Sequence, residues 1–122
     1  MPTPFQILLV DDHAYLRTFL ARMVAETYPD ATVVEAANGT EALAAYQHQP
    51  PDLIISDYQM PIANGLGLVR TLREQGATVP ILILSSNPVI GEGILAAGAS
   101  AFLHKPFAIS EFAQILRILL PA

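Results

Sequence analysis

Short apolar runs alternate along the chain with longer segments in which apolar residues recur every three or four positions. The short runs have the length of buried strands, and the periodic segments have the spacing of helices that bury one side. The predicted strands cover residues 5–10, 32–36, 52–57, 80–85 and 101–104. The predicted helices cover residues 14–28, 39–49, 65–75, 91–99 and 111–120. This alternation predicts an α/β protein, a doubly wound (βα)5 sandwich whose parallel sheet is covered on both faces.

Capping residues and apolar stripes define the helices further. Asn38 with Glu41 three residues later matches a capping box, and Ser110 is a candidate N-cap for the last helix. The first helix carries an apolar stripe that we expect to lie on the sheet, formed by Leu16, Phe19, Leu20, Met23 and Val24. The last helix has an apolar core face formed by Phe112, Ile115, Leu116 and Leu119. Two further apolar positions on the last helix, Ile118 and Leu120, make a protein interface possible there.

Composition narrows the functional classes. The 122 residues, 52% of them hydrophobic, suit one domain over residues 1–122. There is no cysteine, so a disulfide framework and a thiolate metal site are excluded. The formal net charge of -5 argues against binding nucleic acid through its phosphates. Neither a membrane-spanning run nor a secretory signal is recognisable, so we expect a cytoplasmic protein without membrane contact.

Polar residues stand where the predicted strands end. Asp11 and Asp12 follow the first strand, Asp57 ends the third, Ser85 ends the fourth, and Lys105 follows the fifth. In a doubly wound sheet the ligand site lies beyond the carboxyl ends of the strands. These acids, the hydroxyl and the amine are therefore expected to converge at one edge, although they are scattered in sequence.

Three carboxylates in one small pocket raise one another's pKa values unless a cation joins them. Mg²⁺ suits such a site because it takes hard oxygen ligands and keeps waters that a phosphate can replace. Asp57 is the candidate nucleophile toward a phosphoryl group, and the backbone carbonyl of Gln59 is a candidate additional metal ligand. Lys105 is a mobile cation that could pair with the added phosphoryl oxygens, and Ser85 could donate a hydrogen bond to them.

The segments "VDD", "DLIISDYQMPIANG", "ILILSS" and "GASAFLHKPF" closely resemble the receiver domain of two-component response regulators, and the resemblance covers nearly the whole chain. It implies strand order 2-1-3-4-5 and a domain that accepts a phosphoryl group on Asp57 from a sensor histidine kinase or phosphotransfer protein. Mg²⁺ would be held by Asp11, Asp12, Asp57 and Gln59. A family member of this kind is a phosphoryl acceptor with at most self-phosphotransfer and slow autodephosphorylation, not an enzyme acting on other substrates.

The resemblance also implies a switch. Ser85 would move toward the phosphate, Lys105 would form an ion pair with it, and Phe102 stands where the family has an aromatic residue that turns inward. A cis bond before Pro106 is expected, and it would direct Lys105 at the site. The fourth helix, fifth strand and fifth helix would form the surface that meets an output domain or a second copy.

The sequence departs from the family pattern in three places, one of which is Ser86, where the family more often has a small apolar residue. The segment from Ser85 to Gly98 is about two residues shorter than usual, and its stretch "NPVIGEG" is a poor helix start. Phe102 lacks the hydroxyl of the commoner tyrosine. His13, next to the acidic pair, could make metal binding depend on pH.

Two alternatives remain open at this point. The chain could keep the receiver fold but act as an interaction module without phosphorylation, docking through its apolar last helix. It could also be a phosphatase of the haloacid dehalogenase type, which uses a nucleophilic aspartate and Mg²⁺. That family places its two aspartates one residue apart after the first strand, whereas Asp11 and Asp12 are adjacent.

Overall fold

The computed structural model describes residues 4–60 and 64–120, and it contains one five-stranded sheet with the order β2-β1-β3-β4-β5. All four neighbouring pairs are parallel. The strands are β1 (Gln6–Val10), β2 (Thr32–Ala36), β3 (Leu53–Asp57), β4 (Ile81–Ser85) and β5 (Ala101–His104). The predicted doubly wound fold and its strand order are confirmed.

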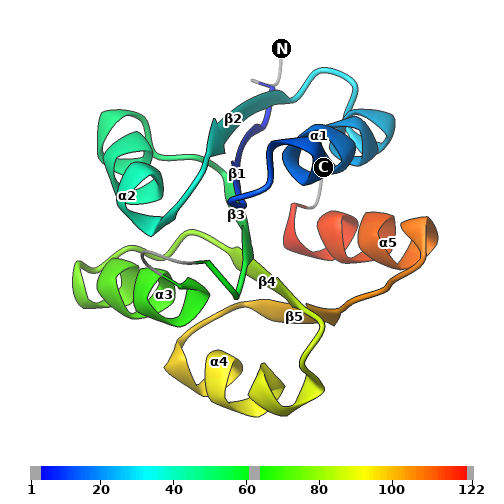
Figure 1. Cartoon of the computed structure of the whole chain (residues 1–122). Helices are drawn as coiled ribbons and strands as arrows, with labels where there is room; N and C mark the ends of the chain where they lie inside the picture. The colour runs from blue at the N-terminus through cyan, green and yellow to red at the C-terminus, as the bar shows by residue number, and fades with distance from the viewer. Residues whose placement is uncertain (1–3, 61–63, 121–122) are drawn as a thin grey trace.

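Four α-helices connect the strands, a fifth follows the last strand, and together they cover both faces of the sheet. They are α1 (Ala14–Thr27), α2 (Gly39–His48), α3 (Gly65–Glu74), α4 (Gly91–Ala97) and α5 (Ile109–Leu119), with a 3-10 turn, η1 (Pro88–Ile90), before α4. Figure 1 shows α1 and α5 on one side of the sheet and α2 and α3 on the other. No helix in the described ranges is long and apolar enough to cross a membrane.

The core consists of two layers separated by the sheet. Alternate residues of β1 point to opposite faces, so that Ile7 packs in the layer under α1 and α5, whereas Leu8 packs in the layer under α2, α3 and α4. Every residue of β3 and β4 is buried. Strands buried on both faces cannot alternate apolar with polar residues, which explains the nearly continuous apolar runs of the sequence.

The N-terminal caps agree in part with the sequence. Asn38 caps α2 by accepting a hydrogen bond from the Glu41 N–H at 2.9 Å, as predicted. Ser110 does not cap α5, and that prediction is wrong. The helix begins two residues earlier at Ile109, because the Glu111 carboxylate accepts a hydrogen bond from the Ala108 N–H at 3.0 Å.

Two predictions about apolar helix positions also need correction. Phe19 does not lie on the core face of α1, since it is 52% exposed, while Leu20, Met23 and Val24 are buried as expected. Leu120 is buried just after α5 and is unavailable to an interface, so that only Ile118 of the two extra apolar positions is exposed.

Candidate functional site

The carboxyl edge of the sheet brings the predicted residues together. β1 runs into Asp11, β3 ends at Asp57, and β5 runs into Lys105. The Lys105 Nζ donates a hydrogen bond to Asp57 Oδ1 at 3.0 Å across 48 positions of sequence. Lys105 is the only lysine of the chain, so no other lysine can take its place in this contact.

Asp57 is held by the backbone around the end of β3. Asp57 is buried, and its backbone carbonyl accepts a hydrogen bond from the Ser56 hydroxyl. The next carbonyl, that of Tyr58, accepts one from the Gly65 N–H at 2.9 Å, which draws the start of α3 against the strand. A Cβ atom at position 65 would lie 3.0 Å from the Asp57 carbonyl oxygen and from the Tyr58 Cα, both backbone atoms, so this close approach favours glycine.

Asp11 is buried at the end of β1, and its backbone is fixed on both sides. Its N–H donates to the Ala36 carbonyl of β2, and its own carbonyl accepts from Arg17 Nη1. Arg17 is in turn anchored by Glu35, with 2.9 Å between Nε and Oε1. Burial raises the pKa of the Asp11 carboxyl, and the negative charge of Asp57 raises it further.

Asp11, Asp12 and His13 form a group of metal-ligand type. One ligand atom from each residue lies within 4.8 Å of the others. Two carboxylates with an imidazole beside them are a donor set that fits a divalent cation. Gln59 is exposed two residues beyond Asp57, in the stretch before residues 61–63, which lie outside the described part of the chain.

The two candidate switch residues lie on neighbouring strands. Ser85 is buried, and its Oγ accepts a hydrogen bond from the Asn87 N–H at 3.0 Å. Phe102 on β5 is half-buried and packs against Gly91 at the start of α4. A Cβ at position 91 would lie 3.2 Å from Phe102 Cδ1, so the ring occupies the space that glycine leaves. The Lys105–Pro106 peptide bond is cis, the isomer implied by the family resemblance.

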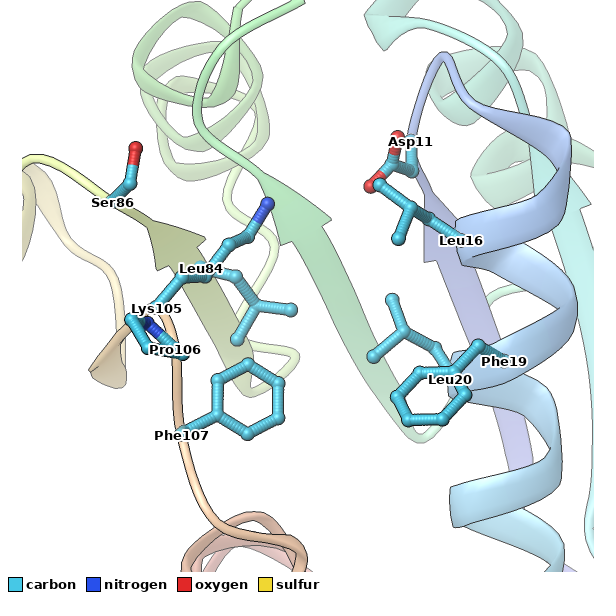
Figure 2. A pocket seen from close by; sticks show the side chains of 9 residues that line it. All are labelled: Asp11, Leu16, Phe19, Leu20, Leu84, Ser86, Lys105, Pro106 and Phe107. Carbon is cyan, nitrogen blue, oxygen red and sulfur yellow. The ribbon is translucent and has the colours of Figure 1, made fainter.

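An open groove of about 370 Å³ adjoins these residues. Its apolar walls come from α1, from the end of β4 and from the segment between β5 and α5, and they comprise Leu16, Phe19, Leu20, Leu84, Pro106 and Phe107. Figure 2 shows Phe107 and Leu84 facing the α1 side chains, with the polar ends of Asp11 and Lys105 toward the same end of the groove. The exposed ring of Phe19 therefore belongs to this groove and not to the core.

Several residues of the site were not found from the sequence. Arg17 and Glu35 lie 18 positions apart, and nothing in their local pattern pairs them. The role of Gly65 was indicated only as a helix boundary, beside Asn64, which caps α3. A charged residue within two turns of an acidic strand end is the one signal that could have suggested Arg17.

Comparison with known proteins places this arrangement among signalling domains. The sequence profile described as the response regulator receiver domain matches residues 7–117. The response regulator MprA of Mycobacterium sp. (strain KMS) is 37% identical over 119 residues, which is 96% of this chain and 51% of MprA. The probable transcriptional regulatory protein TcrX of Mycobacterium tuberculosis is 32% identical over 119 residues, or 50% of its length. The chain thus spans about half the length of these curated relatives.

Solved structures agree with the sequence comparison. The chemotaxis response regulator CheY4 of Vibrio cholerae is 33% identical with a TM-score of 0.86, covering 97% of this chain and 100% of its own. A two-component response regulator of the LuxR family from Aurantimonas sp. SI85-9A1 is 31% identical with a TM-score of 0.86, covering 96% of this chain and 86% of its own.

Proposed function

The chain belongs to the response regulator receiver domain family, and we propose that it accepts a phosphoryl group on Asp57 in a two-component signalling pathway. One observation carries the assignment of the site. A buried carboxylate at the end of β3 is paired at 3.0 Å with the only lysine of the chain, at the same edge as the acidic residues that follow β1.

The proposed reaction moves a phosphoryl group from a phosphohistidine to the protein. A carboxylate oxygen of Asp57 attacks phosphorus, a P–O bond forms, and the P–N bond breaks, leaving the electron pair on the imidazole nitrogen of the donor. The product is an acyl phosphate. Lys105 already contacts the accepting carboxylate, so its ammonium group can pair with the phosphoryl oxygens without crossing the site.

Asp11 and Asp12 are the residues that would hold Mg²⁺, with Asp57 and the Gln59 carbonyl completing the protein ligands. The bound ion would neutralise the phosphoryl oxygens during transfer. The protein's own contribution is to fix Asp11 by hydrogen bonds on both sides of its backbone. Arg17 supplies one of these bonds, and it also brings a positive charge close to the acidic residues.

The groove beside the site supports docking of the donor protein. A helix of a histidine kinase or phosphotransfer protein has apolar side chains that could fill a space of about 370 Å³ lined by Phe19, Leu20 and Phe107. Its phosphohistidine would then reach the polar end, where Asp11 and Lys105 lie. Phe19→Ser should weaken transfer from a protein donor but leave transfer from acetyl phosphate unchanged, because the small donor needs no groove.

Phosphorylation is proposed to change the surface formed by α4, β5 and α5, where an output domain or a second copy would bind. Ser85 would exchange its bond with the Asn87 N–H for one with the phosphoryl group, which would free the turn before α4. Phe102 would follow, since its ring packs on Gly91 at the start of that helix. This is a switch in which a local charge change alters a packed element.

The test is intact mass after incubation with Mg²⁺ and acetyl phosphate, with Asp57→Asn as the control variant. We expect one added phosphoryl group on the wild type and none on Asp57→Asn. Equal labelling of both proteins would refute Asp57 as the acceptor. A folded wild type that binds Mg²⁺ but gains no phosphoryl group would favour an interaction module that works without phosphorylation, and turnover of a phosphate ester would favour a phosphatase.

A further inference from the structure

His13 stands at the start of α1 without capping it. The residue occupies the N-cap position with φ -100° and ψ 111°, and its side chain forms no capping hydrogen bond. Serine, threonine, aspartate and asparagine are preferred there, because their side chains accept hydrogen bonds from the first turn. A histidine gives up that contribution to helix stability, so its side chain needs another explanation.

The imidazole lies against the acidic pair. Its Nδ1 is 3.3 Å from Asp11 Oδ1 and 3.2 Å from Asp12 Oδ1. The ring of Tyr15 packs against it in an edge arrangement, with 5.7 Å between centroids and 62° between planes. This contact gives a packing neighbour to a ring that is half exposed.

The two distances from Nδ1 match what a six-coordinate ion requires of neighbouring ligands. Two ligand atoms at right angles, each about 2.1 Å from an ion, are about 3 Å apart. Nδ1 is within a few tenths of an ångström of that spacing from both carboxylate oxygens, so an ion could replace the direct contacts with only small side-chain movements.

We propose that His13 is a ligand of the divalent cation held by Asp11 and Asp12, and that its Nδ1 makes the site select first-row transition ions such as Co²⁺ and Ni²⁺ over Mg²⁺. The proposal rests on the metal site proposed above and adds a specificity-determining residue to it. Imidazole nitrogen binds Co²⁺, Ni²⁺ and Zn²⁺ well, whereas Mg²⁺ strongly prefers oxygen. A site with one nitrogen among its ligands should therefore discriminate more strongly than an all-oxygen site.

The experiment measures the dissociation constants of Mg²⁺ and Co²⁺ by calorimetry at one fixed pH. It compares the wild type with His13→Asn, Asp12→Asn and the control His48→Asn, which removes an exposed imidazole from the last turn of α2. We expect His13→Asn to weaken Co²⁺ binding at least about tenfold but Mg²⁺ binding less than about threefold. The visible absorption of bound Co²⁺ should also change in His13→Asn, and His48→Asn should behave as the wild type does.

The outcomes separate this inference from the proposed function. If His13→Asn shifts both constants by the same factor, or neither, the imidazole only forms hydrogen bonds with the carboxylates and the inference is wrong, while the metal site stands. If the wild type binds neither ion, the metal site itself is wrong. Loss of both ions in Asp12→Asn shows that the measured binding occurs at this site, and retention of both would refute the assignment.

Discussion

The ion pair formed by Lys105 and Asp57 permits a quantitative test of how the charges of the site are balanced. At 3.0 Å the Coulomb attraction is about 5.5 kcal/mol for an effective dielectric constant of about 20. The two side chains are 29% and 10% exposed, so desolvation offsets much of this attraction. Losing one partner of a fully buried pair costs about 3–5 kcal/mol, and losing one of an exposed pair costs below about 1 kcal/mol.

Lys105→Met is therefore expected to lower the free energy of unfolding of the metal-free protein by about 2 kcal/mol. It leaves the Asp57 carboxylate buried near Asp11 without a cation. Asp57→Asn should instead be neutral or stabilising, because it removes the repulsion between the carboxylates and Lys105 can extend into water. The two substitutions should couple by at least about 1 kcal/mol in a double-mutant cycle.

Urea unfolding followed by circular dichroism measures all four proteins of this cycle, and Arg22→Gln on the exposed side of α1 controls for the loss of one positive charge. Adding Mg²⁺ should stabilise Lys105→Met more than the wild type, since the ion then replaces the missing cation. If Lys105→Met unfolds within about 0.3 kcal/mol of the wild type and the coupling is equally small, the ion pair does not balance the site and the reasoning fails.

Three further predictions concern residues around the site and the core. Asp11→Asn should stabilise the metal-free protein at neutral pH, because burial raises the pKa of the Asp11 carboxyl and disfavours its charged form. Urea unfolding at several pH values measures this difference in stability. The advantage of the variant should vanish as the pH falls below 3.8, the usual pKa of an aspartate. Gly91→Ala should destabilise the protein by about 1 kcal/mol, because the new Cβ would lie 3.2 Å from Phe102. Gly93→Ala should stabilise it by about 0.5–1 kcal/mol, because nothing lies within 4 Å of a Cβ there and alanine favours the helix. Equal effects of the two substitutions in urea unfolding would exclude the steric explanation. Tyr28→Phe should cost about 1 kcal/mol, because the phenol donates a hydrogen bond to the Leu120 carbonyl just after α5, at 2.7 Å, with the Leu116 carbonyl 3.2 Å away. Burial raises the pKa of Tyr28, so the wild type should lose stability above about pH 10, where only the unfolded phenol ionises, and the gap to Tyr28→Phe should narrow in thermal melts there.

The convergence of the site could be predicted because it depends on topology alone. Once the chain is interpreted as alternating strands and helices, the carboxyl ends of parallel strands must share one edge. Asp11, Asp57, Ser85 and Lys105 therefore come together whatever the intervening loops do. The contact between Lys105 and Asp57 follows from these positions and from the length of a lysine side chain.

Side-chain environments beyond the strands could not be predicted in the same way. Phe19 fits the apolar period of α1, but periodicity gives only the direction of a side chain around the helix axis. In the direction of Phe19 the helix faces the groove beside Phe107 and not the sheet. The start of α5 was missed because Ala108 has no capping side chain, and the bond comes from Glu111 three residues later. Contacts such as that of Arg17 with Glu35 depend on tertiary neighbours that no local pattern encodes.

The charges at the carboxyl edge of the sheet suggest how phosphorylation of Asp57 would affect α4. Asp11, Asp12 and Asp57 carry three formal negative charges, and Lys105 carries one positive charge, so a divalent cation would bring the total to zero. Conversion of the Asp57 carboxylate into an acyl phosphate adds about one negative charge, and Lys105 and the Ser85 hydroxyl are side chains of this edge that could donate hydrogen bonds to it. If the Ser85 side chain rotates toward the phosphoryl group, its Oγ moves away from the Asn87 N–H, which begins the segment leading into α4. That helix has seven residues, two of them glycine, so its ordering depends on packing against Phe102 more than on its own helix propensity. We therefore expect the segment from Asn87 to Ala97 to show the largest change in amide hydrogen exchange on phosphorylation. An unchanged exchange rate in this segment, with changes confined to α1, would place the switch elsewhere.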